Sequence, residues 1–290
     1  MLRGMVLAHG QAAPEPDIAS VIGAWPFEPF VWLGLVLAAW WYLRAYARVP
    51  AYPSVRRVHW LVGLGVVGLA LASPVAVYEG SLFWVHMVQH LLLTLVAAPL
   101  LVLGAPVTLA LRAASPGTKE KMLRVLHSRP VRFLTHPAMT WSLFALVMWL
   151  THFTALYDLA LENELLHTTE HFVYLSAACL FWWPVVGLDP GANRLGWPGR
   201  IAYLVLAMPQ QSFLGLAIQQ ANSPLYDHYA TLERTWGPTP LGDQRLAGAI
   251  MWVAGDFLFI GALVLAVLAW MRHDQRATRH LDRRLDEAAL

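Results

Sequence analysis

Four histidines stand out because they lie in or beside long apolar stretches, where an ionisable side chain is costly and usually marks a functional site. His86 and His90 open the run at 83–106, FWVHMVQHLLLTLVAAPLLVLGAP, and His167 and His171 belong to the motif HTTEH. Residues four positions apart share one face of an α-helix, so each pair directs both imidazoles the same way. The pattern indicates two halves of a metal site. The alternative is a set of separate histidines hydrogen-bonded to backbone, water or lipid headgroups.

The elements that position these side chains are predicted to cross a membrane. The chain is 58% hydrophobic and 13% charged, whereas a soluble domain carries roughly a quarter charged residues. A transmembrane helix needs about 20 apolar residues. Seven stretches reach that length: 28–47, 58–77, 82–111, 138–160, 165–187, 200–221 and 246–271. We therefore expect an all-α polytopic membrane protein with a bundle of seven transmembrane helices.

The domain organisation follows from these spans. Residues 25–271 form the transmembrane domain, residues 1–24 an extracytoplasmic arm, and residues 272–290 a charged cytoplasmic tail. Within the domain, segment 112–137 alternates basic and apolar residues. We expect it to lie on the inner membrane surface, against anionic lipid.

The basic residues give the orientation of the spans. They concentrate after the first, third, fifth and seventh spans: Arg44, Arg48, Arg56, Arg57, Arg112, Lys119, Lys121, Arg124, Arg129, Arg132, Arg194, Arg200, Arg272, Arg276, Arg279, Arg283 and Arg284. By the positive-inside rule, the N-terminus is outside and the C-terminus is cytoplasmic. Acidic residues, Glu79 among them, then form a rim around the outer mouth.

This orientation brings a fifth histidine to the same depth. The third and fifth spans begin outside, which places both histidine pairs within roughly the outer 12 Å of the membrane. The fourth span runs outward and ends near His152. We therefore expect one layer of five histidines from three helices near the outer face: His86, His90, His152, His167 and His171.

The available ligand types favour copper. Imidazole with thioether suits copper, particularly Cu(I), whereas Mg and Ca prefer oxygen ligands. Cys179 is the only cysteine, so no CxxC motif contributes. Thioethers at similar depth, or one helical turn below, are weaker ligand candidates because methionine often only fills space in a bundle. They belong to Met87, Met148 and Met251.

Glu170, inside HTTEH, has two interpretations. It could orient an imidazole or offset the charge of the ion, beyond the ligands themselves. HTTEH also matches the HxxEH pattern of inverted zinc proteases, in which Glu170 would be the general base. A haem held by two histidines is a further alternative.

A second polar group lies near the membrane midplane. Asp256 falls roughly 15 Å into the seventh span, and Gln210 and Gln211 reach a similar depth in the sixth. These residues predict either a polar path below the histidines or, as we favour, an interhelical clamp. In the third span, Pro99 removes one backbone hydrogen bond and is expected to distort the helix.

Three long blocks resemble the CtaG-type cytochrome c oxidase assembly factors: HMVQHLLLTLVAAPLLVLGAP, THFTALYDLALENELLHTTEHFVYLSAACLFWWPVVGLDP, and SPLYDHY followed by LGDQRLAGAIMWVAGD. The resemblance implies a multi-span bacterial inner-membrane protein needed for an active, copper-containing oxidase. Gln89 and Asp243 lie in these blocks, so we expect them to support the ligands.

The sequence thus predicts a non-enzymatic assembly factor that binds copper. Its expected partners are cytochrome c oxidase subunits, periplasmic copper chaperones and membrane lipid, with no nucleic acid. A copper transporter, a zinc-dependent membrane enzyme and a metal-free assembly scaffold remain the alternatives.

Overall fold

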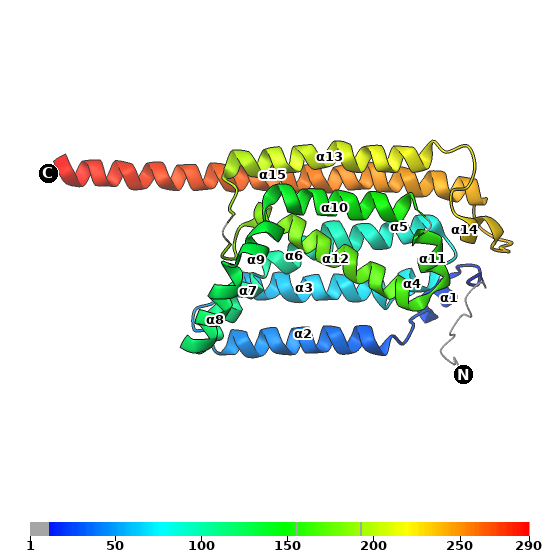
Figure 1. Ribbon diagram of the computed structural model, residues 1–290, viewed down its shortest axis with the longest axis horizontal. Helices are drawn as coiled ribbons and strands as arrows, with labels where there is room; N and C mark the ends of the chain where they lie inside the picture. The colour runs from blue at the N-terminus through cyan, green and yellow to red at the C-terminus, as the bar shows by residue number, and fades with distance from the viewer. Residues whose placement is uncertain (1–11, 155, 192, 290) are drawn as a thin grey trace.

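The computed structural model describes residues 12–154, 156–191 and 193–289, and the regular elements in these ranges are all helices. Long helices lie side by side and a single helix extends past one end of the bundle to the C-terminus (Figure 1). The all-helical prediction is confirmed for this part of the chain. The predicted N-terminal arm lies partly outside it, because residues 1–11 are not among the described residues.

The bundle is built from six long helices and one interrupted stretch. The long helices are α2 (Pro29–Ala47), α3 (Ser54–Leu71), α10 (Pro137–His152), α12 (Glu164–Val186), α13 (Trp197–Gln219) and α15 (Pro240–Ala289). The interrupted stretch contains α5 (Phe83–Leu91), η1 (Leu92–Ala97), α6 (Ala98–Leu103) and α7 (Pro106–Ala113). Short helices connect them: α1 (Ile18–Gly23), α4 (Pro74–Tyr78), α8 (Pro116–Leu126), α9 (Arg129–Leu134), α11 (Leu156–Glu162) and α14 (Asp227–Thr231).

Several helical segments are long and apolar enough to cross a membrane. Within the described residues there are five: Pro29–Ala47, Ser54–Tyr78, Phe83–Ala113, Trp197–Gln219 and Pro240–Arg279. The chain therefore has the character of a helical membrane protein. Helix α10 has 16 residues, about 24 Å at 1.5 Å per residue, and α12 begins with the polar sequence ELLHTTEH. The count of seven spans stays a prediction.

One of the predicted span boundaries was wrong, and a second span contains a break. The predicted span 138–160 ends at His152, and α11 is a separate short helix after it. The predicted span 58–77 falls within the candidate span Ser54–Tyr78, but its helix breaks at Ala72, where Ser73 caps the new helix α4 and Pro74 occupies its first turn. Proline is well suited to that position because its missing N–H is not needed there. Both breaks lie at the end of the bundle that carries the histidines.

The third stretch is distorted just before Pro99, as the sequence predicts. In the π-helical segment η1, the N–H of Ala98 donates to the carbonyl of Leu93, five residues back. In this register the next donor would be residue 99, which as proline has no N–H. The carbonyl of Thr94 instead accepts from the indole Nε1–H of Trp182 on α12, at 2.9 Å. The carbonyl that the interrupted helix leaves without a backbone donor thus forms a hydrogen bond with α12.

Two buried carboxylates fix the ends of the same stretch. Asp243, at the start of α15, accepts from the backbone N–H groups of Phe83 and Trp84 at 3.0 and 3.1 Å. At the opposite end, Asp189 accepts from the N–H of Thr108 at 2.6 Å, in the first turn of α7. The first N–H groups of a helix have no partner within it. Each carboxylate therefore satisfies donors that would otherwise be buried without a partner.

Segment 112–137 and the C-terminal tail lie at the end of the bundle away from α4, α11 and α14 (Figure 1). Helices α8 and α9 contain no buried residues, and both carry basic side chains. The predicted tail at 272–290 begins within α15, which continues as one helix of 50 residues from Pro240 to Ala289.

Helices α13 and α15 make the closest crossing in the bundle, at Gly215 and Gly248. A Cβ atom at Gly215 would lie 2.8 Å from the carbonyl oxygen of Gly248 and 2.8 Å from the backbone nitrogen of Trp252. Small residues at such crossings let two backbones approach. We expect Gly215→Ala to force the helices apart and to lower stability by about 1–3 kcal/mol.

Thermal unfolding of the purified protein in detergent measures this effect. Gly261→Ala is the matched control, since a Cβ at this position on α15 meets nothing within 4 Å. Equal melting temperatures for the two variants would contradict the close crossing.

Candidate metal centre

Five histidines from α5, α10 and α12 form one cluster near an end of the bundle. The ring centroids of His86 and His90 lie 4.0 Å apart, and those of His167 and His171 lie 4.3 Å apart. Across helices, His86 lies 5.8 Å from His167, and His90 lies 5.9 Å from His152. The structure therefore brings together all five predicted histidines.

The cluster is enclosed, and several of its nitrogens lack partners. His86, His90 and His152 are 0%, 5% and 2% exposed. Among the described residues, no hydrogen-bond partner is found for His86 Nε2, for either nitrogen of His90, or for His152 Nε2. Buried polar atoms are normally hydrogen-bonded. A group of unpaired buried nitrogens facing one another is the arrangement expected of ligands around an ion.

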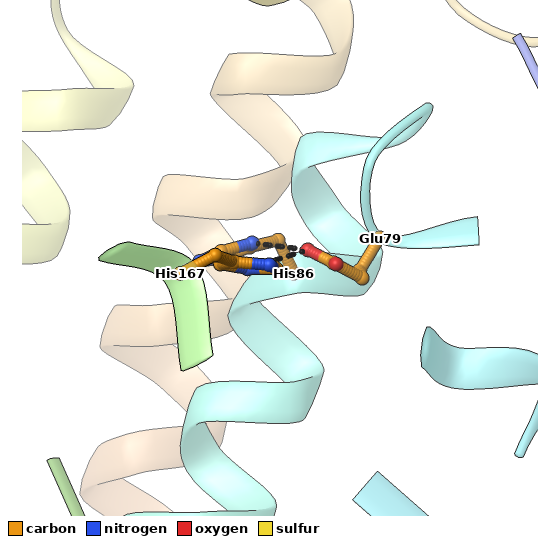
Figure 2. Close-up of side chains that lie close together, drawn as sticks. All are labelled: Glu79, His86 and His167. Carbon is orange, nitrogen blue, oxygen red and sulfur yellow. Dashed lines mark hydrogen bonds and ion pairs between the residues drawn. The ribbon is translucent and has the colours of Figure 1, made fainter. Parts of the chain in front are cut away.

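Glu79 holds two of the imidazoles (Figure 2). Its Oε2 lies 2.7 Å from His86 Nδ1 and 3.4 Å from His167 Nε2. Burial opposes ionisation of this carboxyl, but the two histidines outweigh it and hold the pKa of Glu79 well below its usual range. Because a carboxylate only accepts hydrogen bonds, His86 donates through Nδ1 and keeps the Nε2 lone pair for a ligand.

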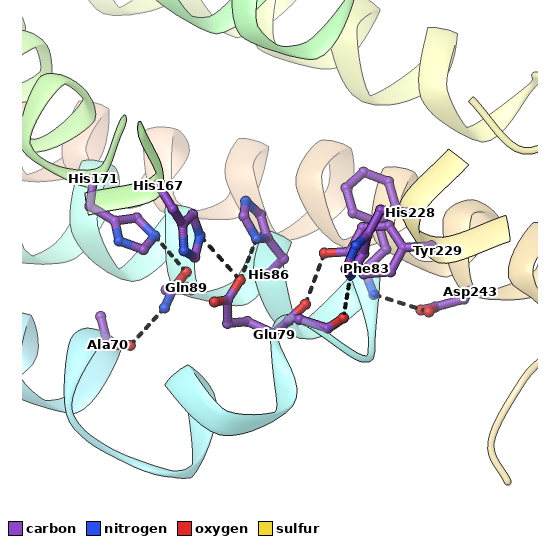
Figure 3. A network of polar contacts seen from close by, with 11 residues as sticks. Ala70, Glu79, Phe83, His86, Gln89, His167, His171, His228, Tyr229 and Asp243 are labelled. Carbon is purple, nitrogen blue, oxygen red and sulfur yellow. Dashed lines mark hydrogen bonds and ion pairs between the residues drawn. The ribbon is translucent and has the colours of Figure 1, made fainter. Parts of the chain in front are cut away.

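Backbone and amide groups orient two further rings, of which that of His171 is drawn in Figure 3. His171 Nε2 lies 2.9 Å from Gln89 Oε1, and Gln89 Nε2 donates to the carbonyl of Ala70 at 3.0 Å. His152 Nδ1 donates to the carbonyl of Met148 at 2.7 Å. Such outer contacts fix the tautomer and the direction of a metal-binding imidazole. Gln89 thus contacts a predicted ligand, as the sequence leads us to expect.

Glu170 is a buried carboxylate inside the cluster. It is 8% exposed, and neither of its oxygens has a hydrogen-bond partner among the described residues. Ligand atoms of Glu170, His86 and His90 all lie within 4.8 Å of one another. An unpaired buried carboxylate is costly. Glu170 is therefore a candidate for direct contact with a cation, as well as for orienting an imidazole that binds the cation.

Aromatic side chains from the connections that contain α11 and α14 cover the cluster. The ring of Tyr157 on α11 lies 5.1 Å from His86 and 4.2 Å from Tyr226. Tyr229 on α14 donates through its hydroxyl to the carbonyl of Glu79 at 2.8 Å, and Tyr226 donates to the carbonyl of His152 at 3.0 Å. The connections therefore cover His86 and hold the backbone of Glu79 and His152.

The predicted thioether ligands are buried in the main apolar core. Met87, Met148 and Met251 are 1%, 3% and 4% exposed and pack within one hydrophobic cluster. Their place as copper ligands stays a prediction.

The deeper polar residues join α13 to α15. Ser212 donates to Asp256 Oδ2 at 2.7 Å. A Cβ at Gly255 would lie 3.2 Å from the side chain of Gln211, which shows how closely that side chain packs. Gln210 Nε2 and Gln211 Oε1 have no hydrogen-bond partner among the described residues. The partner of Asp256 is thus serine rather than either glutamine, and the geometry fits the clamp interpretation.

Glu79 and Tyr157 belong to the site, although the sequence did not predict them there. The sequence places Glu79 only among the acidic residues of the rim. The signal for its role is Ser73-Pro74, which starts a new helix inside the second span and redirects the chain toward His86. Tyr157 follows a helix end at His152 that has no strong stop residue in the sequence.

Fold and site together define a helical membrane protein with an enclosed centre of imidazoles and carboxylates. The model of the cytochrome c oxidase caa3 assembly factor family (Caa3_CtaG) matches residues 36–273. The chain belongs to this family.

The curated relatives come from mycobacteria. The chain is 33% identical to uncharacterized proteins of Mycobacterium bovis and Mycobacterium tuberculosis, and 31% identical to one of Mycobacterium leprae. Each match covers 96% of this chain and 44% of the relative, so the chain spans less than half the length of these proteins. No solved structure matches the chain.

Asp243 anchors the helix that carries His86 and His90, although it does not bond to either ring. Its carboxylate accepts from two N–H groups of α5 and lies 3.6 Å from the guanidinium of Arg234. We expect Asp243→Ala to destabilise the fold by about 1–3 kcal/mol for each buried N–H left without an acceptor.

Thermal unfolding compared with Asp227→Ala, which removes an exposed carboxylate, measures this loss. An unchanged melting temperature for Asp243→Ala would show that α5 does not depend on the contact.

Proposed function

We propose that this protein binds copper in the histidine cluster and supports its insertion into a cytochrome c oxidase. The observation that carries the proposal is the set of unpaired nitrogens on His86, His90 and His152, which face one another inside an apolar bundle. Family membership gives the link to oxidase assembly. His167 and His171 complete the proposed ligand set, on rings that adjoin the same cluster.

Copper fits the donor set better than oxygen-preferring cations do, and the family's link to the oxidase favours it over other transition metals. Imidazole nitrogens suit Cu, Zn, Fe and Ni, and oxygen-preferring cations such as Mg and Ca would leave the nitrogens unused. Cys179 is the only cysteine, so thiolate ligation by a cysteine pair does not compete. Thioethers from Met87, Met148 or Met251 would add affinity for Cu(I).

The proposed setting is the bacterial inner membrane, crossed by seven helices with the N-terminus outside. Basic residues gather on α8, α9 and the end of α15, away from the histidine cluster (Figure 1). With that end cytoplasmic, the cluster faces the outer side. There it would receive copper from periplasmic chaperones and deliver it to oxidase subunits.

An assembly factor of this kind needs no catalytic turnover. The zinc-enzyme alternative assigns Glu170 as general base, and a transporter needs a polar path past Asp256. The Ser212–Asp256 hydrogen bond instead joins two helices, which supports a site that holds an ion on one side of the membrane.

The test is complementation of a strain that lacks the gene, with metal content measured on the same proteins after purification. The variant His86→Ala/His90→Ala/His167→Ala/His171→Ala should lose both bound copper and active oxidase. The control, His127→Ala/His273→Ala, removes two exposed histidines and should behave as wild type.

The four-histidine variant must first show wild-type helix content and membrane insertion. A folded variant that still restores oxidase activity would contradict the copper role and leave the metal-free scaffold. Copper-free wild-type protein carrying zinc, with an activity lost in Glu170→Gln, would favour the enzyme.

A further inference from the structure

We infer that the centre offers a cation two overlapping positions that share His86 and are used one after the other. The outer position lies between Glu79, His86 and His167, and the inner position lies between His86, His90 and Glu170. This inference rests on the proposed function and adds a direction to it. In each position the ligand atoms lie within 4.8 Å of one another.

The outer position is the more accessible of the two. Glu79 follows α4, and His167 lies in the first turns of α12, at the end of the bundle where the aromatic cover sits. The side chain of His167, which belongs only to the outer position, is 19% exposed, whereas His90, which belongs only to the inner position, is 5% exposed. An ion arriving at this end therefore meets His167 and Glu79 before it meets His90.

The inner position is enclosed on every side by buried groups. His90 and Glu170 are 5% and 8% exposed, and all four of their side-chain nitrogen and oxygen atoms lack hydrogen-bond partners among the described residues. The outer carboxylate already has two imidazole partners, but the inner carboxylate has none. A cation would therefore stabilise the inner position more than the outer one, because it would supply the missing partner of the inner carboxylate.

His86 connects the two positions through its two ring nitrogens. Nδ1 lies 2.7 Å from Glu79 in the outer position, and Nε2 has no partner. Its ring lies 4.0 Å from that of His90, between centroids. Capture of an ion at Nδ1 releases to solvent the proton that Nδ1 otherwise donates to Glu79. When the ion moves on to Nε2, Nδ1 takes up a proton again and restores its hydrogen bond to Glu79.

Each position combines imidazoles with one carboxylate, so the ligand class is a first-row transition cation rather than Mg or Ca. The outer carboxylate attracts the cation and sets the rate of capture, and the inner carboxylate sets how tightly the cation is held.

The experiment separates rate from affinity. The full-length protein in detergent takes Cu(I) from a coloured chelator, and both the uptake rate and the equilibrium distribution are recorded. The variants are Glu79→Gln and Glu170→Gln, with Glu164→Gln as control for an exposed carboxylate on the same helix as Glu170. Each must keep the wild-type melting temperature.

We expect Glu79→Gln to slow uptake about tenfold or more, as for loss of an attracting charge. Its effect on affinity should be much smaller, because the amide oxygen of Gln still accepts the hydrogen bond from His86 that orients the ring. Glu170→Gln should weaken affinity by about 10-fold to 100-fold and leave the uptake rate near that of wild type. The control should match wild type in both.

Equal changes in both quantities for the two variants would overturn the inference, because they would describe one position with two carboxylates. No change in either variant would overturn it as well, while copper binding by the wild type would leave the proposed function standing. A wild-type protein that takes up no copper would contradict both the inference and the proposed function.

Discussion

The hydrogen bond between Glu79 and His86 is the interaction on which the centre depends. An imidazole buried at 0% exposure would be costly without a partner, and the carboxylate supplies that partner on Nδ1 at 2.7 Å. The bond also fixes which nitrogen remains free. Because Glu79 reaches His167 as well, one carboxylate aligns α12 with α5 and determines where the second histidine pair lies.

The rest of the bundle keeps α5 in place for this contact. Asp243 satisfies the first N–H groups of α5, and Trp182 satisfies the carbonyl that Pro99 leaves without a donor. Both partners come from elements distant in sequence, so the histidine helix is held by α12 and α15 rather than by its own hydrogen-bond ladder alone. Rigid support of this kind keeps ligands in position before an ion arrives.

Patterns in the sequence predict much of this architecture. Apolar length predicts membrane helices, and the i, i+4 spacing of His86 with His90 and of His167 with His171 predicts two rings on one face, as found. The predicted depth of the fourth span also places His152 in the same layer. In the structure the centroid of its ring lies 5.9 Å from that of His90.

Helix ends and the approach of separate helices were harder to predict. The helix expected to run unbroken to residue 77 breaks at Ala72, and this break places the carboxylate of Glu79 beside His86. Hydropathy does not register such a break, because the residues on both sides of it are apolar. Similarly, the choice of Ser212 over Gln210 or Gln211 as partner of Asp256 depends on helix rotation, which composition does not encode.

The most direct test of the central claim is X-ray absorption at the copper edge of the loaded, purified protein. A cluster of imidazoles around the ion predicts a first shell of nitrogen or oxygen neighbours, together with the outer-shell scattering of several imidazole rings. Copper bound without imidazole scattering would place the ion elsewhere in the chain and contradict the assignment of the histidine cluster as its site.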